Sequence, residues 1–192
     1  MSQIEPTCIG TEPSWVEEVL HFWFQELEAT LWFATSDELD SKIRARFLVL
    51  HERIVNGAVP DNSRPRPLLA AVIVLDQFSR NMFRGTPRAF AADAMARSLA
   101  RRAIEQGLDV AMTPEQRYFV YLPFEHSEDR EDQALSVRLI GKLANEEWTR
   151  YALAHQSTIN RFGRFPHRNA ILGRTSQPDE LPFVNLSFSR QL

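Results

Sequence analysis

The chain has 192 residues and a formal net charge of −3, a length that fits one compact domain. Hydrophobic residues make up 44% and charged residues 24%, the balance of an ordinary globular protein, which excludes a disordered tail or a coiled-coil rod. Only seven glycines are present, which argues against an all-β protein with many tight turns. The net negative charge also argues against nucleic acid as a partner.

The composition predicts a soluble, cytoplasmic protein that does not contact a membrane. The longest unbroken apolar run, Leu68 to Leu75, is too short to span a bilayer, and the first ten residues lack the pattern of a secretory signal. Cys8 is the only cysteine, so neither an intramolecular disulfide nor a thiolate zinc site can form. We expect a single domain over residues 1–192, with residues 1–13 and 187–192 as loosely attached ends.

Helical periodicity begins with two amphipathic segments. Ser14 is followed three residues later by a glutamate, the spacing of a capping box at the start of a first helix. A second helix is expected to begin near Thr35, with the same spacing, and to end at Asn56. Residues 60–67 are predicted to form a loop, and Pro67 to serve as the first-turn proline of the next helix.

The segment 68–81 reads LLAAVIVLDQFSRN and is apolar on nearly all sides, so it is predicted to be the buried central helix. A further helix is expected over about 87–106, where apolar residues recur at helical intervals. Thr113 is followed directly by a proline and, three positions on, by a glutamine, which is a complete helix start. Pro123 is expected to interrupt or end that helix.

The last two predicted helices cover residues 129–144 and 146–162, and Gly163 closes the second. No segment shows the alternation of polar and apolar residues that is typical of a β-strand. Seven or more helices joined by short connections pack as neighbours. The expected fold class is therefore all-α, with seven to nine helices stacked as antiparallel hairpins.

Three polar clusters are candidates for a functional site, and the first lies at the end of the central helix. Asp76 and Arg80 are four residues apart, so they share a helix face and can pair, and Arg84 follows one turn later. A surface ion pair is the plain interpretation. Because the helix is apolar all round, we expect the pair to be partly buried, which favours a functional role.

The second cluster contains Glu125 and His126, two groups that can act as general acid or base near neutral pH. Adjacent residues on a helix point about 100° apart, so one of the two is expected to be structural. Ser127 or Asp129 is a candidate cap for the following helix.

The third cluster is the segment RFGRFPHRN, residues 161–169. It projects its polar side chains from a rigid turn, and its arginines suit bidentate contacts to a carboxylate or a phosphate. The alternative is that these arginines neutralise the acidic residues between positions 125 and 132. The two interpretations are compatible.

The sequence lacks the motifs of several common kinds of binding and catalytic site. The phosphate-binding loop and the dinucleotide fingerprint are absent, as is the nucleophile elbow of hydrolases. The five histidines form no metal-binding pair at helical spacing, so we expect neither a metal nor a cofactor. His155 lies on an apolar stripe and is predicted to be a core histidine with its hydrogen bonds satisfied.

Three long motifs in the same order resemble a bacterial family catalogued as domain of unknown function 924. The motifs are LDQFSRNMFRGTPRAFAADAMA (residues 75–96), LPFEHSEDREDQALSV (122–137) and RFGRFPHRNAILGR (161–174). The resemblance extends from about Val16 to Phe183. It implies an all-α fold related to tetratricopeptide repeats, a right-handed superhelix of helix hairpins, and it implies no activity.

One smaller feature supports the resemblance, and two depart from it. The pair Trp32-Phe33 is similar to an aromatic pair of the family, whereas Ser79 stands where the family motif leads us to expect proline. The loop over residues 59–67 also differs from the usual one.

The leading hypothesis is a soluble binding protein with an arginine- and histidine-lined groove for an anionic small molecule or peptide. Its predicted ligand-binding residues are Arg80, Arg84, Arg161, Arg164, His167, Arg168 and Asn169. The alternative is a small-molecule enzyme of the hydrolase type, in which Glu125 or Asp76 is the base, His126 or His167 the acid and the arginines a substrate clamp. An RNA-associated protein is a third hypothesis, which the net charge opposes. The oligomeric state stays open.

The three clusters are predicted to meet in space. The charged residues of the apolar central helix need charged partners, and the other two clusters are the dense supplies of both signs. We expect Asp76 or Arg80 to lie within one side-chain layer of Glu125 or His126, with Arg161 or Arg168 nearby.

Overall fold

The computed structural model describes residues 12–57 and 63–184. Within these ranges the chain is all helical and has no strand, and its eight α-helices fall within the predicted seven to nine. The α-helices are α1 (Ser14–His21), α2 (Asp37–Val55), α3 (Pro65–Val72), α4 (Ser79–Met82), α5 (Asp93–Glu105), α6 (Pro114–Glu125), α7 (Arg130–Ile140) and α8 (Glu146–Phe162). No helix in this part of the chain has the length and hydrophobicity needed to cross a membrane.

A continuous helical path forms the centre of the molecule. It begins as α3, widens into a π-helix over Ile73–Phe78 and ends as α4. Every residue from Pro67 to Ser79 is buried, so this is the buried central helix that the sequence predicts. A π-helical turn changes the directions of its side chains relative to those of a regular α-helix, and such turns are frequent at functional sites. Here it carries Asp76, the buried acid of the first cluster.

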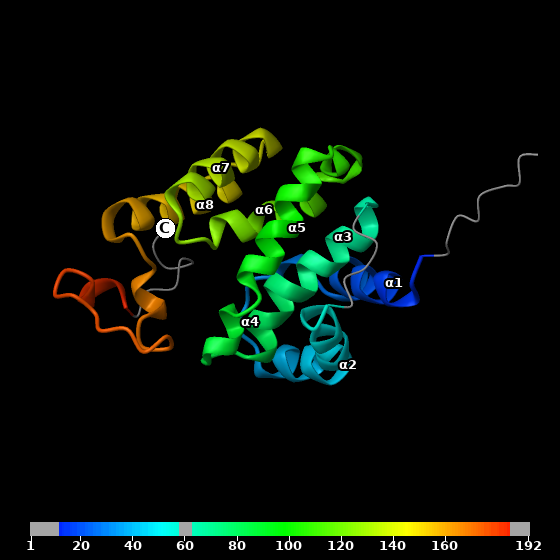
Figure 1. Cartoon of the computed structure of the whole chain (residues 1–192), viewed down its shortest axis with the longest axis horizontal. Coiled ribbons are helices and arrows are strands. Elements are labelled where there is room, and N and C mark those ends of the chain that lie inside the picture. Colours follow the sequence, from blue (N-terminus) through cyan, green and yellow to red (C-terminus); the bar gives the residue numbers. More distant parts are fainter. Residues whose placement is uncertain (1–11, 58–62, 185–192) are drawn as a thin grey trace, which may run out of the picture.

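The other helices pack around this path largely in chain order (Figure 1). α1, α5 and α6 contact α3, and α2 contacts α4 and the π-helical turn. α7 packs against α6, and α8 packs against α7, so the last two helices extend the molecule on one side (Figure 1). Short connections between successive helices explain this neighbour-to-neighbour packing.

Aromatic side chains pack the central helical path against α2, α6 and the segment that follows α1. Phe78 packs against Phe47 of α2 with ring centroids 4.7 Å apart, and against Trp23 at 5.5 Å. Trp23 in turn contacts Phe119 of α6 at 5.4 Å. Aromatic pairs of this kind contribute about 0.5–1.5 kcal/mol beyond the area they bury. The packing therefore fixes residues 76–80 relative to α6, whose end carries the second cluster.

Of the three capping boxes predicted from the sequence, one is confirmed and two are wrong. Thr113 caps α6 in a full capping box, as expected. Ser14 is already the first helical residue of α1, which no side chain caps. The cap of α2 is Ser36 rather than Thr35, because the extended backbone of Ser36 directs its hydroxyl to the N–H of the third helical residue.

Pro123 does not end its helix, contrary to expectation, since α6 continues to Glu125. A proline removes its own N–H donor and crowds the carbonyl one turn back. In α6 every residue from 118 to 125 is buried, and tertiary packing outweighs this local cost so close to the helix end.

The other boundaries differ by smaller amounts. The predicted helix over 87–106 is divided into a 3-10 turn, Pro87–Phe90, and α5. α3 begins two residues before Pro67. α8 has the predicted bounds, and Gly163 ends it with a φ of 68°, a left-handed conformation that favours glycine. The predicted loose ends, 1–13 and 187–192, lie outside the described residues apart from positions 12 and 13.

Candidate functional site

A fully buried carboxylate anchors the first cluster. Asp76 is 0% exposed, and Arg80 Nη1 lies 2.9 Å from its Oδ1 atom. His126 Nδ1 lies 2.9 Å from the same oxygen, and Gln77 Nε2 donates to Oδ2 at 2.6 Å. The predicted meeting of the first two clusters is therefore confirmed.

The charges around Asp76 set the protonation of His126. Burial alone would raise the pKa of Asp76, but the charges of Arg80 and His126 outweigh burial and lower this pKa to about 2. Burial, together with the positive charge of Arg80, lowers the pKa of His126. At neutral pH a neutral imidazole therefore donates its Nδ1–H to an ionised carboxylate. This tautomer leaves Nε2 as a hydrogen-bond acceptor.

Glu125, the buried carboxyl group of the second cluster, contacts a second histidine, His155. His155 Nδ1 is 3.1 Å from Glu125 Oε1 and 2.9 Å from the carbonyl oxygen of Tyr151. Burial, and then the negative charge of Asp76, raises the pKa of Glu125 to about 8, so this carboxyl keeps its proton at pH 7. Its Oε2 atom has no hydrogen-bond partner among the described residues. Burial also holds the pKa of His155 well below its usual value.

Arg168 brings the third cluster to the same place. Its guanidinium carbon lies 4.7 Å from the ring centre of Phe90 and 4.4 Å from that of Phe165. Asp93 Oδ2 is 3.7 Å from Arg168 Nη1, too far for a hydrogen bond, and Asp93 already accepts two hydrogen bonds from Arg80. Burial, and then the like charge of Arg80, lowers the pKa of Arg168 to about 10. Arg168 is therefore a buried cation whose charge is only partly compensated.

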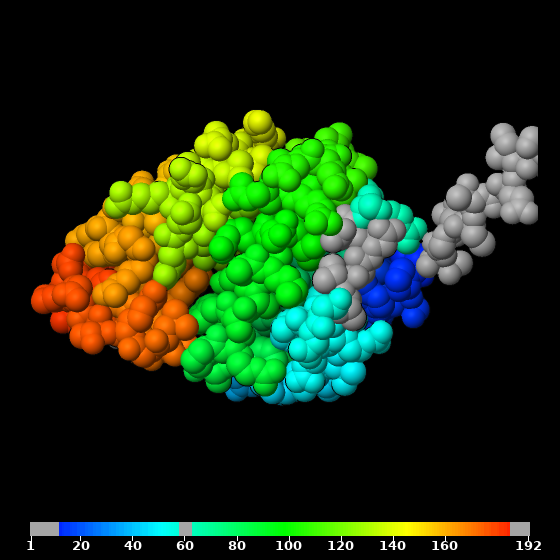
Figure 2. All heavy atoms as spheres, viewed as in Figure 1, coloured from blue at the N-terminus to red at the C-terminus, as the bar shows by residue number. Residues whose placement is uncertain are grey.

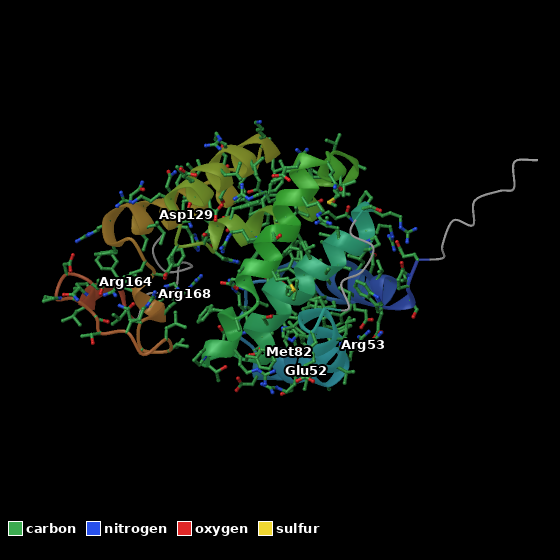
Figure 3. The ribbon with its side chains drawn as sticks, viewed as in Figure 1. Glu52, Arg53, Met82, Asp129, Arg164 and Arg168 are labelled. Atoms are coloured by element: carbon green, nitrogen blue, oxygen red, sulfur yellow. The ribbon has the colours of Figure 1, made fainter. Side chains whose placement is uncertain are left out.

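A pocket of about 280 Å³, slightly smaller than most small-molecule sites, lies beside His126, His155 and Arg168. It lies where residues 167–171 meet residues 80–90, and Figure 2 shows the orange and green surfaces of these regions meeting along a seam. In Figure 3, Arg168 lies closer to the central ribbon than Arg164 does. The titratable side chains of the lining are Arg80, Arg84, His126, His155, His167 and Arg168.

Four of the seven predicted ligand-binding residues line this pocket: Arg80, Arg84, His167 and Arg168. Arg84 is held by Asp40, which accepts from its Nη2 atom at 2.9 Å. Burial, and then the charge of Arg168, lowers the pKa of His167 to about 4. The two residues predicted as candidate bases, Asp76 and Glu125, do not line the pocket; they lie behind His126 and His155, which do.

The other three predicted residues lie outside the pocket, in contact with the C-terminal part of the chain. Arg164 Nε donates to Glu180 at 2.6 Å, and Asn169 Nδ2 donates to the same carboxylate at 3.1 Å. Arg161 packs over the rings of Phe162 and Phe183. After α8 the chain folds back on itself and supplies these local partners.

The acidic residues between positions 125 and 132 form their direct ion pairs with arginines other than Arg161, Arg164 and Arg168. Glu128 binds Arg174 at 2.7 Å and accepts from the backbone N–H of Phe165. Asp132 binds Arg97 and Arg101 of α5. Asp129 caps α7 by accepting two backbone N–H bonds, as one of the two candidates for that role.

Two residues that line the pocket, His155 and Phe90, and one that lies behind it, Asp93, were not singled out from the sequence as site residues. His155 was expected to be a core histidine with its hydrogen bonds satisfied; it is buried and its Nδ1 atom is hydrogen-bonded, and it also lines the pocket. Asp93 and Phe90 hold Arg80 and Arg168. Asp93 could have been noticed in the sequence, because it is the one acidic residue in the run of mostly small residues AFAADAMA. Nothing in the local sequence distinguishes Phe90 as a site residue.

The model of a family described as bacterial protein of unknown function (DUF924) matches residues 19–187 of the chain. The chain is a member of DUF924. A solved structure, that of a protein of unknown function from Agrobacterium tumefaciens, is 34% identical in sequence, with a TM-score of 0.84 over 89% of this chain and 97% of that one. No curated protein matches the sequence.

In this DUF924 protein, Ser79 occupies the position where the resemblance led us to expect proline. Its hydroxyl oxygen lies 2.9 Å from Nε2 of His51, and both residues are buried. Asp76 and Arg80 still face each other one turn apart, so serine preserves the ion pair. Over the described ranges, no group of three or more His, Cys, Asp or Glu residues is placed to hold a metal ion.

Proposed function

We propose that this DUF924 protein binds a small anion, a carboxylate or a phosphate, in the pocket beside Arg168. The observation that carries the proposal is the state of Arg168: a buried guanidinium, 8% exposed, whose carboxylate neighbour Asp93 is 3.7 Å away. A buried charge that is poorly paired is costly. An anionic ligand would supply the missing partner.

The setting of Arg168 supports a fixed binding geometry. Phe90 and Phe165 pack against its guanidinium, so little side-chain entropy is lost when a ligand binds. A planar guanidinium held in this way suits the bidentate recognition of a carboxylate or phosphate. The volume of about 280 Å³ favours a small molecule over a peptide, which narrows the prediction made from the sequence.

A thermal-shift screen of small carboxylates and phosphates tests the proposal. At 100 times its Kd, a ligand stabilises the native state by about 2.7 kcal/mol, so the melting temperature should rise by several degrees. The rise should disappear in Arg168→Gln and persist in Arg138→Gln, which changes an exposed arginine of α7. Sodium chloride at matched ionic strength controls for screening. Equal responses of the two variants would contradict the proposal.

A second candidate function is acid–base catalysis on the bound anion, and the Asp76–His126 pair favours it. A buried carboxylate fixes the imidazole through Nδ1, which leaves Nε2 to take a proton from water or substrate. The reaction class would be hydrolysis of a small ester. Asp76 would act as a positioning residue, because it lies behind His126 and does not line the pocket.

A panel of small phosphate and carboxyl esters tests this second function. Hydrolysis should be lost in His126→Gln, while anion binding persists, and it should be kept in His21→Gln, which changes an exposed histidine. If the protein binds the anion but hydrolyses no ester, the catalytic function is contradicted and only the anion-binding function stands.

Two further inferences concern location and architecture. We infer a cytoplasmic protein, because a lone cysteine is typical of a reducing compartment. We also infer tetratricopeptide-like stacking, supported by the successive packing of α6, α7 and α8. Fractionation of the producing cell tests the first inference.

A further inference from the structure

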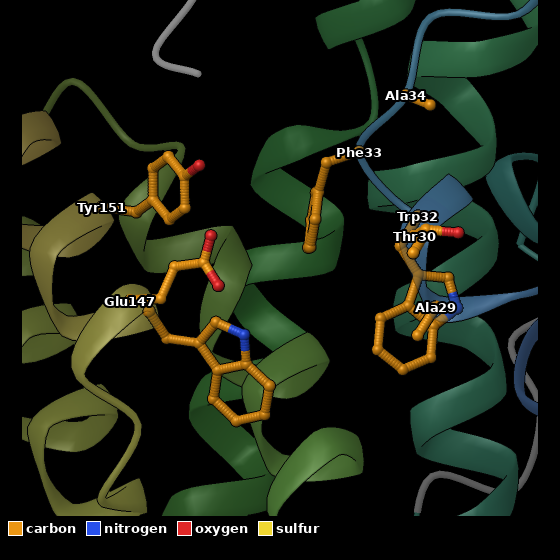
Figure 4. A pocket seen from close by; sticks show the side chains of 8 residues that line it. Ala29, Thr30, Trp32, Phe33, Ala34, Glu147 and Tyr151 are labelled. Carbon is orange, nitrogen blue, oxygen red and sulfur yellow. The ribbon is translucent and has the colours of Figure 1, made fainter. Parts of the chain in front are cut away.

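A second pocket, of about 520 Å³, lies between the segment after α1 and the start of α8. Its lining includes the rings of Trp32, Phe33, Trp148 and Tyr151 and the carboxylate of Glu147. Figure 4 shows Phe33 and Tyr151 on opposite sides of the space, with the carboxylate of Glu147 directed between them. None of these residues belongs to the anion pocket.

The aromatic walls are held in place from behind. Trp32 Nε1 donates to the carbonyl oxygen of Trp23 at 2.9 Å, and its ring packs edge-on against Phe119 at 5.0 Å. Trp148 stacks on Tyr118 with ring centroids 4.4 Å apart and planes 5° from parallel. Both walls therefore rest on the same turn of α6, and the pocket is formed before a ligand arrives.

Two side chains of this pocket, Phe33 and Glu147, are exposed and can contact a ligand. The side chain of Phe33 is 55% exposed, although a large apolar ring gains free energy by burial. Glu147 is exposed and forms no ion pair with any described residue, even though Arg150 follows three residues later on the same helix. A negative charge beside several aromatic faces produces a site that attracts a cation.

We propose that this pocket binds an organic cation of the quaternary ammonium class. Aromatic faces attract such a cation through the ring quadrupole, and the carboxylate of Glu147 adds a direct charge partner. A metal ion or a primary ammonium needs several oxygen acceptors. The lining offers few beyond Glu147, so methylated nitrogen is preferred.

Choline is the probe, and its binding is followed by calorimetry and by tryptophan fluorescence. The comparison ligand is its uncharged carbon analogue, in which a tert-butyl group replaces the trimethylammonium group. We expect saturable choline binding and at least about threefold weaker binding of the analogue, because cation–π attraction and the charge of Glu147 are lost. Ethanolamine, the primary amine, should also bind more weakly.

Matched variants locate the site. Glu147→Gln and Phe33→Ala should each weaken choline binding by about threefold to tenfold, and both change exposed side chains, so the fold should persist. Glu146→Gln removes the neighbouring exposed carboxylate, which does not line this pocket, and should leave binding unchanged. Absence of saturable binding, equal affinity for the uncharged analogue, or equal effects of the two glutamate variants would overturn the proposal.

Discussion

His126 Nδ1 lies 2.9 Å from Asp76 Oδ1, although 50 residues separate the two in sequence. The contact joins the end of α6 to the π-helical turn of the central path. It fixes the tautomer of the imidazole and places His126 in the wall of the pocket that Arg168 shares. We therefore expect the stability of the molecule and the acid–base catalysis proposed for His126 to depend on the same buried carboxylate.

The first prediction concerns the removal of that carboxylate. Asp76→Ala leaves the partly buried side chains of Arg80 and His126 without their shared partner, which should lower the free energy of unfolding by about 3–5 kcal/mol. Asp37→Ala is the control, because Asp37 is exposed in the first turn of α2 and should cost at most about 1 kcal/mol. Urea denaturation of the two variants measures the difference. Equal losses would contradict a shared buried site.

The second prediction concerns pH. The pKa of Glu125 is about 8 in the folded protein, against an ordinary value of 4.5. Between these values unfolding releases a proton from Glu125, so its contribution to stability is full below about pH 4.5 and is lost as the pH rises to 8. Glu125→Gln removes this contribution.

The measurement is the free energy of unfolding of Glu125→Gln relative to the native protein from pH 5 to 8. The difference should change steadily in favour of the variant as the pH rises. Comparison at each pH cancels the opposite trend of His126, His155 and His167, whose lowered pKa values make stability rise with pH. A difference that is constant with pH would contradict a protonated Glu125.

The third prediction concerns the serine of the central path. Ser79→Ala removes the hydroxyl that contacts His51 Nε2 and leaves that buried nitrogen without this contact, at a cost of about 1–3 kcal/mol. Ser98→Ala, at an exposed position of α5, should be neutral or slightly stabilising because alanine is the better helix former. Thermal unfolding of both variants is the test, and a neutral Ser79→Ala would show that the contact contributes nothing.

The fourth prediction distinguishes Arg164 from Arg168, two of the three arginines of the third cluster. Arg164→Gln breaks the contacts to Glu180 and should loosen the C-terminal segment, which limited proteolysis can detect. It should leave anion binding unchanged, because Arg164 does not line the pocket. Loss of binding in Arg164→Gln would place the anion elsewhere.

The sequence predicted the helices well because each carries its own local signal. The apolar face of residues 68–81 and the capping box at Thr113 needed no knowledge of distant residues. Pro123 was misjudged for the opposite reason, since the helix continues past it only because its surroundings in the folded chain bury it. The split between the 3-10 turn at Pro87 and α5 likewise has no local marker.

The candidate site was predictable in part. Charge compensation pointed correctly to the meeting of Asp76, His126 and Arg168. Local pattern gave no means of separating Arg168 from Arg164, because the separation depends on Glu180, sixteen positions beyond Arg164. It also gave no means of recognising Phe90, whose role arises only when Arg168 packs against it.

The most direct test of the anion pocket is an NMR titration of the five histidines with and without inorganic phosphate or malonate, at matched ionic strength. An anion beside Arg168 favours the protonated imidazole of its neighbours, so the pKa of His167, about 4 in the free protein, should rise, and that of His126 should rise with it. His21, which is exposed and does not line the pocket, should not move. If neither anion shifts His126 and His167 more than His21, the pocket does not bind anions and the central claim fails.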